Sequence, residues 1–228
     1  IALLFSVTAI LGAVAQIPFG RLSDRMDRRL VIVFLSGGAA IIGLLTVLAG
    51  TAGLLAGGLQ PGDLVFRRGN GRWSGYFAGA SGDEGFFSHV GLLVQGGEGW
   101  QVVHTEADDR TGVGGVRTDS LRHFLAEAHG VAVVRPRLEA AQAAKAVQLA
   151  HDPAWQAIPF DARFRLDDGG EAMYCTEWIQ ALVLAATGED IARPRSHFGR
   201  IQIISIDDLR LSARVEPVFD HRLATAGR

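Results

Sequence analysis

Two long stretches near the start of the chain carry no charged residue, residues 1–19 and residues 30–61. A transmembrane helix needs roughly 20 consecutive apolar residues, so either stretch is long enough to cross a bilayer. The polar residues 20–29 separate them. The pattern therefore predicts a transmembrane helical hairpin within residues 1–57, with its loop at residues 20–29.

Two other interpretations of these stretches agree less well with the sequence. A secretory signal peptide over residues 1–19 would need a basic segment and an initiating Met ahead of the apolar run, and neither is present. A pair of buried helices in a water-soluble fold would rarely be free of charge over such a length. The hairpin is therefore the preferred prediction.

The rest of the chain, residues 59–228, alternates short apolar segments with turn-forming residues, which predicts a separate α+β domain with a mostly antiparallel sheet. The last dozen residues are expected to form a loose tail. Strands are expected at residues 64–66, 87–94, 100–106, 113–117, 131–135 and 201–206, and helices at residues 120–128, 139–151 and 175–187.

A hairpin is expected from residues 87–106, and its turn decides which side chains face each other. A two-residue turn at residues 97–98 places His89 opposite Glu106, whereas a five-residue loop sets His89 against Thr105 and turns Glu106 away. The position of Glu106 relative to His89 therefore depends on a tight turn.

Charge and cysteine content exclude some classes of function. The formal net charge of -2 gives no electrostatic basis for binding nucleic acid. Cys175 is the only cysteine, so an internal disulfide framework is excluded, and cysteine usage does not identify the compartment.

Cys175 stands at the expected start of a helix, where unpaired N–H groups and partial positive charge stabilise a thiolate. A lone cysteine is otherwise a small core residue. Cys175 shares a helix face with Trp178 and Ile179, so its thiol is expected to point toward the sheet. The position favours a nucleophile without establishing one.

A cysteine nucleophile needs a base within hydrogen-bond reach and a third group that orients the base. His89 is the candidate base, and Gly91 on the same strand face leaves room for close approach. A structural histidine is the alternative for His89. On the next strand His104 and Glu106 share a face, and either could orient the base.

The first part of the chain resembles a known membrane-protein segment. Residues 16–29 (QIPFGRLSDRMDRR) resemble the loop motif of major facilitator transporters, which follows one membrane helix and precedes the next. In that family the loop is cytoplasmic, as the positive-inside bias favours. The resemblance implies a two-helix transporter-like fragment that anchors the chain in a bacterial membrane. The domain after residue 58 would then be periplasmic or extracellular.

The second part carries five short motifs in a fixed order. They are residues 61–64 (PGDL), 88–91 (SHVG), 106–107 (EA), 160–164 (FDARF) and 174–177 (YCTE). Their order resembles the YiiX/YebB branch of the NlpC-type papain-like cysteine hydrolases, whose fold is circularly permuted so that the histidine strand precedes the cysteine helix.

The resemblance implies an α+β, circularly permuted papain-like (NlpC-type) domain and assigns roles to residues. Cys175 would be the nucleophile, with its backbone N–H helping to bind the oxyanion, and His89 the general base. Glu106 would orient His89, with His104 as the alternative, because the related lecithin:retinol acyltransferases use a second histidine. The remaining candidate pocket residues are Tyr174, Asp161 and Phe164.

The expected activity is that of a cysteine hydrolase that cleaves an amide or ester bond through a thioester acyl-enzyme, with acyl transfer also possible. No cofactor and no metal are expected. The substrate would be an amide- or ester-containing molecule, such as a cell-wall peptide or a lipid-linked acyl group.

Two alternatives from other classes stay open. In one, the second part of the chain binds zinc through histidine, glutamate and cysteine side chains, a combination that zinc accepts, although no C-x-x-C spacing is present. In the other, the chain is a membrane-transporter fragment and the second part is an appended, non-catalytic domain. The zinc ligands would be His89, His104, Glu106 and Cys175.

Overall fold

The computed structural model describes residues 58–69, 74–81, 83–192 and 195–222, all within one compact unit, Gly53–Arg228. The predicted transmembrane hairpin at residues 1–57 lies outside the described residues. Among the residues that are described, no helix combines the length and the apolar character needed to span a membrane.

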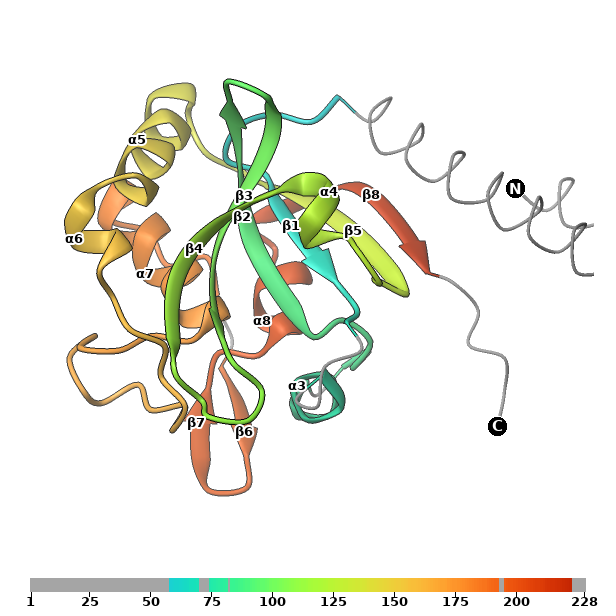
Figure 1. Ribbon diagram of the computed structural model, residues 1–228, viewed down its shortest axis with the longest axis vertical. Helices are drawn as coiled ribbons and strands as arrows, with labels where there is room; N and C mark the ends of the chain where they lie inside the picture. The colour runs from blue at the N-terminus through green and yellow to red at the C-terminus, as the bar shows by residue number, and fades with distance from the viewer. Residues whose placement is uncertain (1–57, 70–73, 82, 193–194, 223–228) are drawn as a thin grey trace, which may run out of the picture. The chain divides into compact units, whose positions relative to one another are not determined.

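The domain is built on a six-stranded sheet in which every pair of neighbours is antiparallel, in the order β4-β3-β2-β1-β5-β8 (Figure 1). The first strand in the chain thus lies in the middle of the sheet. Its strands are β1 Leu64–Arg67, β2 His89–Gly96, β3 Gly99–Ala107, β4 Gly114–Ser120, β5 Gly130–Pro136 and β8 Val215–Arg222.

Helices α5 and α7 lie on one face of the sheet, with α7 packed against β2 and β3, and α4 lies on the other face. A small β6–β7 hairpin stands apart from the sheet (Figure 1). The remaining elements are α3 Ser74–Ala80, α4 Leu121–Phe124, α5 Ala140–Ala150, α6 Pro153–Gln156, α7 Cys175–Thr187, β6 Ser196–Phe198, β7 Ile201–Ile203 and α8 Ile206–Arg210.

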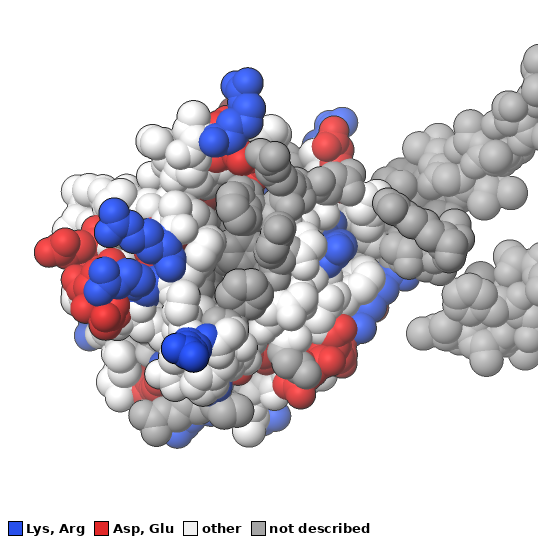
Figure 2. Space-filling model, turned by 90° about the horizontal axis from the view of Figure 1, so that it is seen from below, with Lys and Arg blue, Asp and Glu red and all other residues white. Residues whose placement is uncertain are grey.

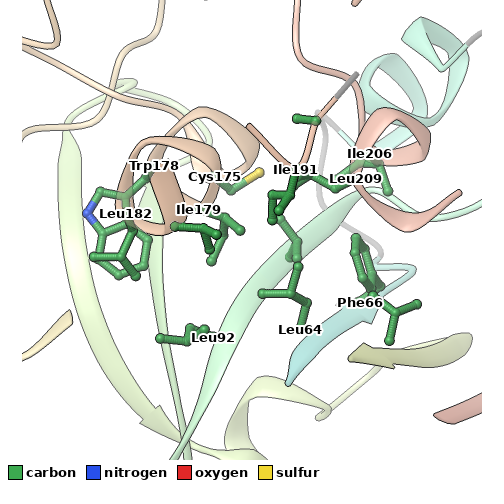
Figure 3. Packing of buried hydrophobic residues seen from close by; sticks show 14 of the residues in the cluster. Leu64, Phe66, Leu92, Cys175, Trp178, Ile179, Leu182, Ile191, Ile206 and Leu209 are labelled. Carbon is green, nitrogen blue, oxygen red and sulfur yellow. The ribbon is translucent and has the colours of Figure 1, made fainter. Parts of the chain in front are cut away.

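The larger core lies between α7 and the sheet. Trp178, Ile179 and Leu182 are fully buried against apolar side chains of β1 and β2, among them Leu64 and Leu92 (Figure 3). Burial of such side chains contributes about 1.5–3 kcal/mol each. Gly188 ends the helix with a φ of 74°, a left-handed conformation that suits glycine.

The predicted elements are found with small shifts of their ends, but the C-terminal part differs from the prediction. The expected strand at residues 201–206 stops at Ile203, because Ser205 caps a new helix by accepting the N–H of Asp208 at 3.1 Å. The expected loose tail is wrong for residues 217–222, and residues 223–228 lie outside the described part of the chain. Strand β8 pairs with β5, and Arg222 of β8 is held by Asp220 and Glu84.

Acidic and basic side chains are interspersed on the face shown in Figure 2. Several of them form ion pairs at the surface, such as Arg165 with Asp167 at 2.7 Å. The described residues of that face therefore mix both signs of charge (Figure 2).

Candidate active site

A cleft of about 300 Å³ has both Cys175 and His89 in its wall. Other parts of the wall come from the ends of β1 and β3 and from residues 160–164, which precede α7. Its volume is at the lower end of the range for small-molecule sites. The structure thus brings the two principal predicted residues to one cavity.

Cys175 is the first residue of α7 and belongs to the core between α7 and the sheet, so its side chain lies on the predicted face (Figure 3). Burial raises the pKa of its thiol to about 12, although the backbone N–H groups of Val90, Thr176 and Cys175 itself act in the opposite direction. The thiolate expected at the helix start is therefore not the resting form, because desolvation outweighs the helix N-terminus.

The residues on either side of Cys175, Tyr174 and Thr176, both form hydrogen bonds to the backbone of Ile204. Ile204 donates its N–H to the Tyr174 hydroxyl at 2.8 Å, and its carbonyl accepts a hydrogen bond from the Thr176 hydroxyl at 2.6 Å. Both side chains are buried. The start of α7, and with it the sulfur, is fixed from both sides.

His89 contacts His104 rather than Glu106. Nε2 of His89 lies 2.9 Å from Nδ1 of His104, and Nε2 of His104 lies 3.1 Å from a carboxylate oxygen of Asp119. The ring of Phe124 packs against both imidazoles. His104 was the alternative orienting residue in the sequence, whereas Asp119 was not identified there.

Both imidazoles are neutral near pH 7. Burial lowers the pKa of His89 well below its ordinary value, and the charges of His104, when it is protonated, and of Arg67 and Arg117 lower it further. Burial also lowers the pKa of His104 to about 4, against the opposing effects of Glu106 and Asp119.

The chain of hydrogen bonds fixes which nitrogens carry protons. Burial raises the pKa of Asp119, but hydrogen bonds from Arg117 and His104 outweigh it and leave the pKa below its usual value, so the carboxylate accepts. His104 therefore carries its proton on Nε2 and accepts at Nδ1 from Nε2–H of His89. Nδ1 of His89 is left with a free lone pair, which is what a general base requires.

Glu106 lies in the cleft wall but is engaged elsewhere. One of its carboxylate oxygens pairs with Arg67, and the other lies 3.5 Å from Arg117. The predicted tight turn is confirmed, with Gly96 paired to Gly99, but the paired ladder stops at Leu92–Val103. Because the ladder does not extend to His89, the register does not bring Glu106 to the imidazole.

The three predicted pocket residues have different positions. Phe164 lines the cleft, whereas Tyr174 is buried behind it with the two ring centroids 5.3 Å apart. Asp161 is also buried, and its carboxylate accepts the N–H groups of Arg163 and Arg165 at 2.7 and 2.5 Å. Tyr174 and Asp161 thus lie behind the cleft wall and do not line the cleft.

The alternative of a zinc site can be compared with the donor atoms. Among the described residues, the group of three or more potential metal ligands whose donor atoms all lie within 4.8 Å of one another is His104, Glu106 and Asp119, without Cys175. Both carboxylates are already paired with guanidinium groups, and both ring nitrogens of His104 have partners. These groups are therefore better described as an ion-pair network than as the ligands of a zinc ion.

A family model described as permuted papain-like amidase enzyme, YaeF/YiiX, C92 family, matches residues 58–202. The fold is similar to the crystal structure of metalloprotein yiiX from Escherichia coli O157:H7, with a TM-score of 0.59 and 17% sequence identity over 72% of this chain and 98% of that chain. No curated protein matches the chain.

Proposed function

Because the chain belongs to the C92 family of permuted papain-like amidases, we propose that it hydrolyses an amide bond with Cys175 as nucleophile and His89 as general base. The observation that carries this proposal is the Asp119–His104–His89 chain, which leaves Nδ1 of His89 as a proton acceptor in the cleft that Cys175 also lines. Membership of the family supports a cysteine amidase or peptidase-like hydrolase.

Acylation begins from neutral side chains. Nδ1 of His89 takes the thiol proton while the sulfur of Cys175 attacks the amide carbon, and the carbonyl electrons move to oxygen. The tetrahedral intermediate collapses as the C–N bond breaks, and the imidazolium returns its proton to the leaving amine. A thioester on Cys175 remains.

Deacylation repeats the same proton transfers with water. His89 takes a proton from a water molecule as its oxygen attacks the thioester carbon, and the C–S bond then breaks. The proton returns to the sulfur, and the carboxylic acid leaves. The N–H of Cys175 at the start of α7 is the proposed donor to the oxyanion in both steps.

The orienting role falls to His104 in this proposal. Its contact with Nε2 of His89 holds the imidazole in one tautomer, and Asp119 in turn holds His104. Glu106 acts one step further away, since it neutralises Arg67 and Arg117 beside the two histidines. Glu106 acts to raise the pKa of His104, so burial, and not this carboxylate, keeps the histidine pair neutral.

The proposal is tested with 4-nitrophenyl acetate as a minimal acyl donor. We expect a burst of nitrophenol and an acetyl adduct on Cys175 in the intact-mass spectrum, both absent from Cys175→Ala. His89→Ala should lose the burst while keeping the thermal stability of the fold. Equal turnover by the native protein and Cys175→Ala would overturn the proposal.

Membrane anchoring through residues 1–57, with the hydrolase domain outside the cytoplasm, is part of the same proposal. It rests on the apolar stretches and the polar loop between them. Protease added to right-side-out spheroplasts should digest the domain. Protection of the domain until the membrane is permeabilised would contradict this location.

A further inference from the structure

The segment Ile204–Arg210, which follows β7 and contains α8, holds both neighbours of the proposed nucleophile through its first residue. The N–H of Ile204 donates to the Tyr174 hydroxyl at 2.8 Å, and the Thr176 hydroxyl donates to the carbonyl of Ile204 at 2.6 Å. Tyr174 and Thr176 are each 2% exposed, so bulk water does not compete for these bonds. The position of Ile204 thus determines where α7 begins, and with it where the sulfur of Cys175 lies.

The same segment holds the turn that leads into His89. The backbone N–H groups of Glu84 and Gly85 both donate to Oδ2 of Asp207, at 2.9 Å each. Gly85 has a φ of 59°, and a Cβ there would lie 2.9 Å from a carbonyl oxygen of α3, so the turn is tight. Residues 86–88 alone separate this turn from His89.

The residues between that turn and His89 are themselves held in place. Phe87 is fully buried, and the guanidinium of Arg210 lies over its ring at 5.2 Å. Ser88 is also buried, and its N–H donates to the carbonyl of Arg67 at 3.0 Å. A displacement of the turn is therefore passed on to the start of β2, where His89 stands, because no exposed loop lies between them to absorb it.

The segment is held in one conformation by its own side chains. The N–H of Ser205 donates to Asp208 at 2.7 Å, and the N–H of Asp208 donates to the Ser205 hydroxyl at 3.1 Å, which caps α8. Asp207 pairs with Arg210 at 3.2 Å, and both are buried. Apolar side chains of α8 belong to the same core as Cys175 (Figure 3). The two ends of the segment therefore move together.

We infer that the segment Ile204–Arg210 is a positioning element of the proposed reaction, which sets the distance between the sulfur of Cys175 and the imidazole of His89. Thr176 and Asp207 are the positioning residues through which it acts. The inference rests on the proposed function, and the segment follows the last residue that the family model matches. A misplacement of about 1 Å between reacting groups costs roughly 10²-fold in rate.

The first test acts on the nucleophile. Thr176→Val keeps the shape of the side chain and removes the hydroxyl. We expect the rate constant of the 4-nitrophenyl acetate burst to fall by about 10–100-fold with little change in the half-saturating concentration, because geometry and not binding is lost. Thr176→Ser keeps the hydroxyl and should recover most of the rate. Thr187→Val removes a hydroxyl that donates to Val183 at the other end of α7, and as the matched control it should react at the native rate.

The second test acts on the base. Asp207→Ala should lower the burst rate constant by about tenfold, and Asp207→Asn, which keeps an acceptor for the two N–H groups, should restore part of it. Asp63→Ala is the matched control. Asp63 is likewise buried, accepts the N–H of Gln60 and pairs with Arg135, but it precedes β1 at the end away from the cleft.

The rates are compared well below the melting temperature of each variant, so that a general loss of stability does not enter. Asp63→Ala should then react at the native rate. Should Asp207→Ala not fold, Asp207→Asn takes its place in every comparison, with Asp63→Asn as its control. An equal loss of rate in the Asp63 and Asp207 variants would assign Asp207 a purely structural role and overturn the inference.

A double-mutant cycle tests whether one element sets one distance. Thr176→Val combined with Asp207→Ala should lose clearly less than the product of the two single losses, because the first change already releases the distance. Losses that multiply would show two independent anchors and overturn the inference. Native burst rates in both single variants, with the burst still abolished by Cys175→Ala, would also overturn it and leave the proposed function intact. Absence of a burst from the native protein would overturn the proposed function, and this inference with it.

Discussion

The imidazoles of His89 and His104 meet edge to face, with Nε2 of the first 2.9 Å from Nδ1 of the second and the ring planes 84° apart. Two neutral rings can share this contact only if one donates and the other accepts. Asp119 decides the direction, since its carboxylate accepts from the far nitrogen of His104. The protonation of the candidate base is thus set by a residue on β4 that does not touch it.

Asp119→Asn should reverse this direction. The new amide can donate to Nε2 of His104, which would place the proton of His104 on Nδ1 and force Nε2 of His89 to accept. Nδ1 of His89 would then carry a proton and could not act as a base. We expect kcat for 4-nitrophenyl acetate to fall by about 10²–10⁴-fold with little change in KM.

Arg117→Gln is the control for this substitution. Arg117 also contacts Asp119, at 2.9 Å, and helps to keep it ionised, but its replacement leaves the carboxylate in place to accept from Nε2–H of His104. Its kcat should stay within about tenfold of the native value, because a partly exposed ion pair contributes little. A similar loss for both variants would show that charge balance, and not the tautomer, is what matters.

The acid stability of the domain should depend on His104. The pKa of His104 is about 4 in the folded protein and 6.5 when unperturbed, so the unfolded chain binds more protons between these values. The contribution of neutral His104 is present above pH 6.5 and is lost as the pH falls through 4. It amounts to about 3 kcal/mol, from 1.36 kcal/mol per pKa unit.

Urea unfolding at pH 7 and pH 4.5 measures this contribution. The difference in unfolding free energy between the two pH values should be smaller for His104→Gln than for the native domain. His151→Gln, at an exposed position, should behave like the native domain. An unchanged difference for His104→Gln would mean that His104 is already protonated in the folded state.

The hairpin at residues 97–98 shows how far the sequence alone could locate the candidate site. Turn length and the alternation of side chains predicted the pairing of Gly96 with Gly99 correctly. The same arithmetic did not show that pairing stops at Leu92–Val103, or that beyond this pair the side chain of His104 contacts His89. A Cβ on Gly91 would lie 3.0 Å from that of His104, which shows how closely the two strands approach there.

Asp119 was missed for a different reason. It lies on β4, where His104 pairs with Arg117, and it reaches His104 diagonally from two residues further along the strand. Only the order of strands β4-β3-β2 brings Asp119 and His89 to the two sides of His104. Strand β8 was missed because its alternating burial includes many half-exposed polar residues, which resemble a solvated tail.

Alkylation of Cys175 should continue to rise with pH well above 9 in the folded apo protein. Burial raises the pKa of the thiol to about 12, whereas the same thiol in urea should react with a midpoint near 8.5. Cys175 is the only cysteine, so incorporation of iodoacetamide by mass spectrometry reports on it alone. Circular dichroism at each pH verifies that the fold persists.

The opposite result would change the mechanism. The native protein could instead reach its maximal rate of alkylation below pH 7, while His89→Ala does not. This result would reveal a thiolate–imidazolium pair before substrate binds. The sequence alone favoured a thiolate, from the position of Cys175 at the helix start. The structure instead favours proton transfer during attack, since burial disfavours both charged forms.

Glu177→Gln should stabilise the domain at neutral and alkaline pH. Burial raises the pKa of Glu177 to about 8, with the charges of Asp168 and Asp161 adding to the shift. The folded state therefore binds more protons than the unfolded chain between pH 4.5 and 8, and stability is lost as the pH rises through this range. Gln removes this loss, on the order of 3 kcal/mol at pH 7, and can still accept the N–H of Tyr174.

The measurement is the melting temperature at pH 5 and pH 8. Glu177→Gln should melt higher than the native domain at pH 8 and at nearly the same temperature at pH 5, because the carboxyl is already protonated there. Glu171→Gln, at an exposed position of the preceding loop, should change neither value. A lower melting temperature of Glu177→Gln at pH 8 would show that the ionised carboxylate caps α7 and helps to hold the start of the helix, including Cys175, in place.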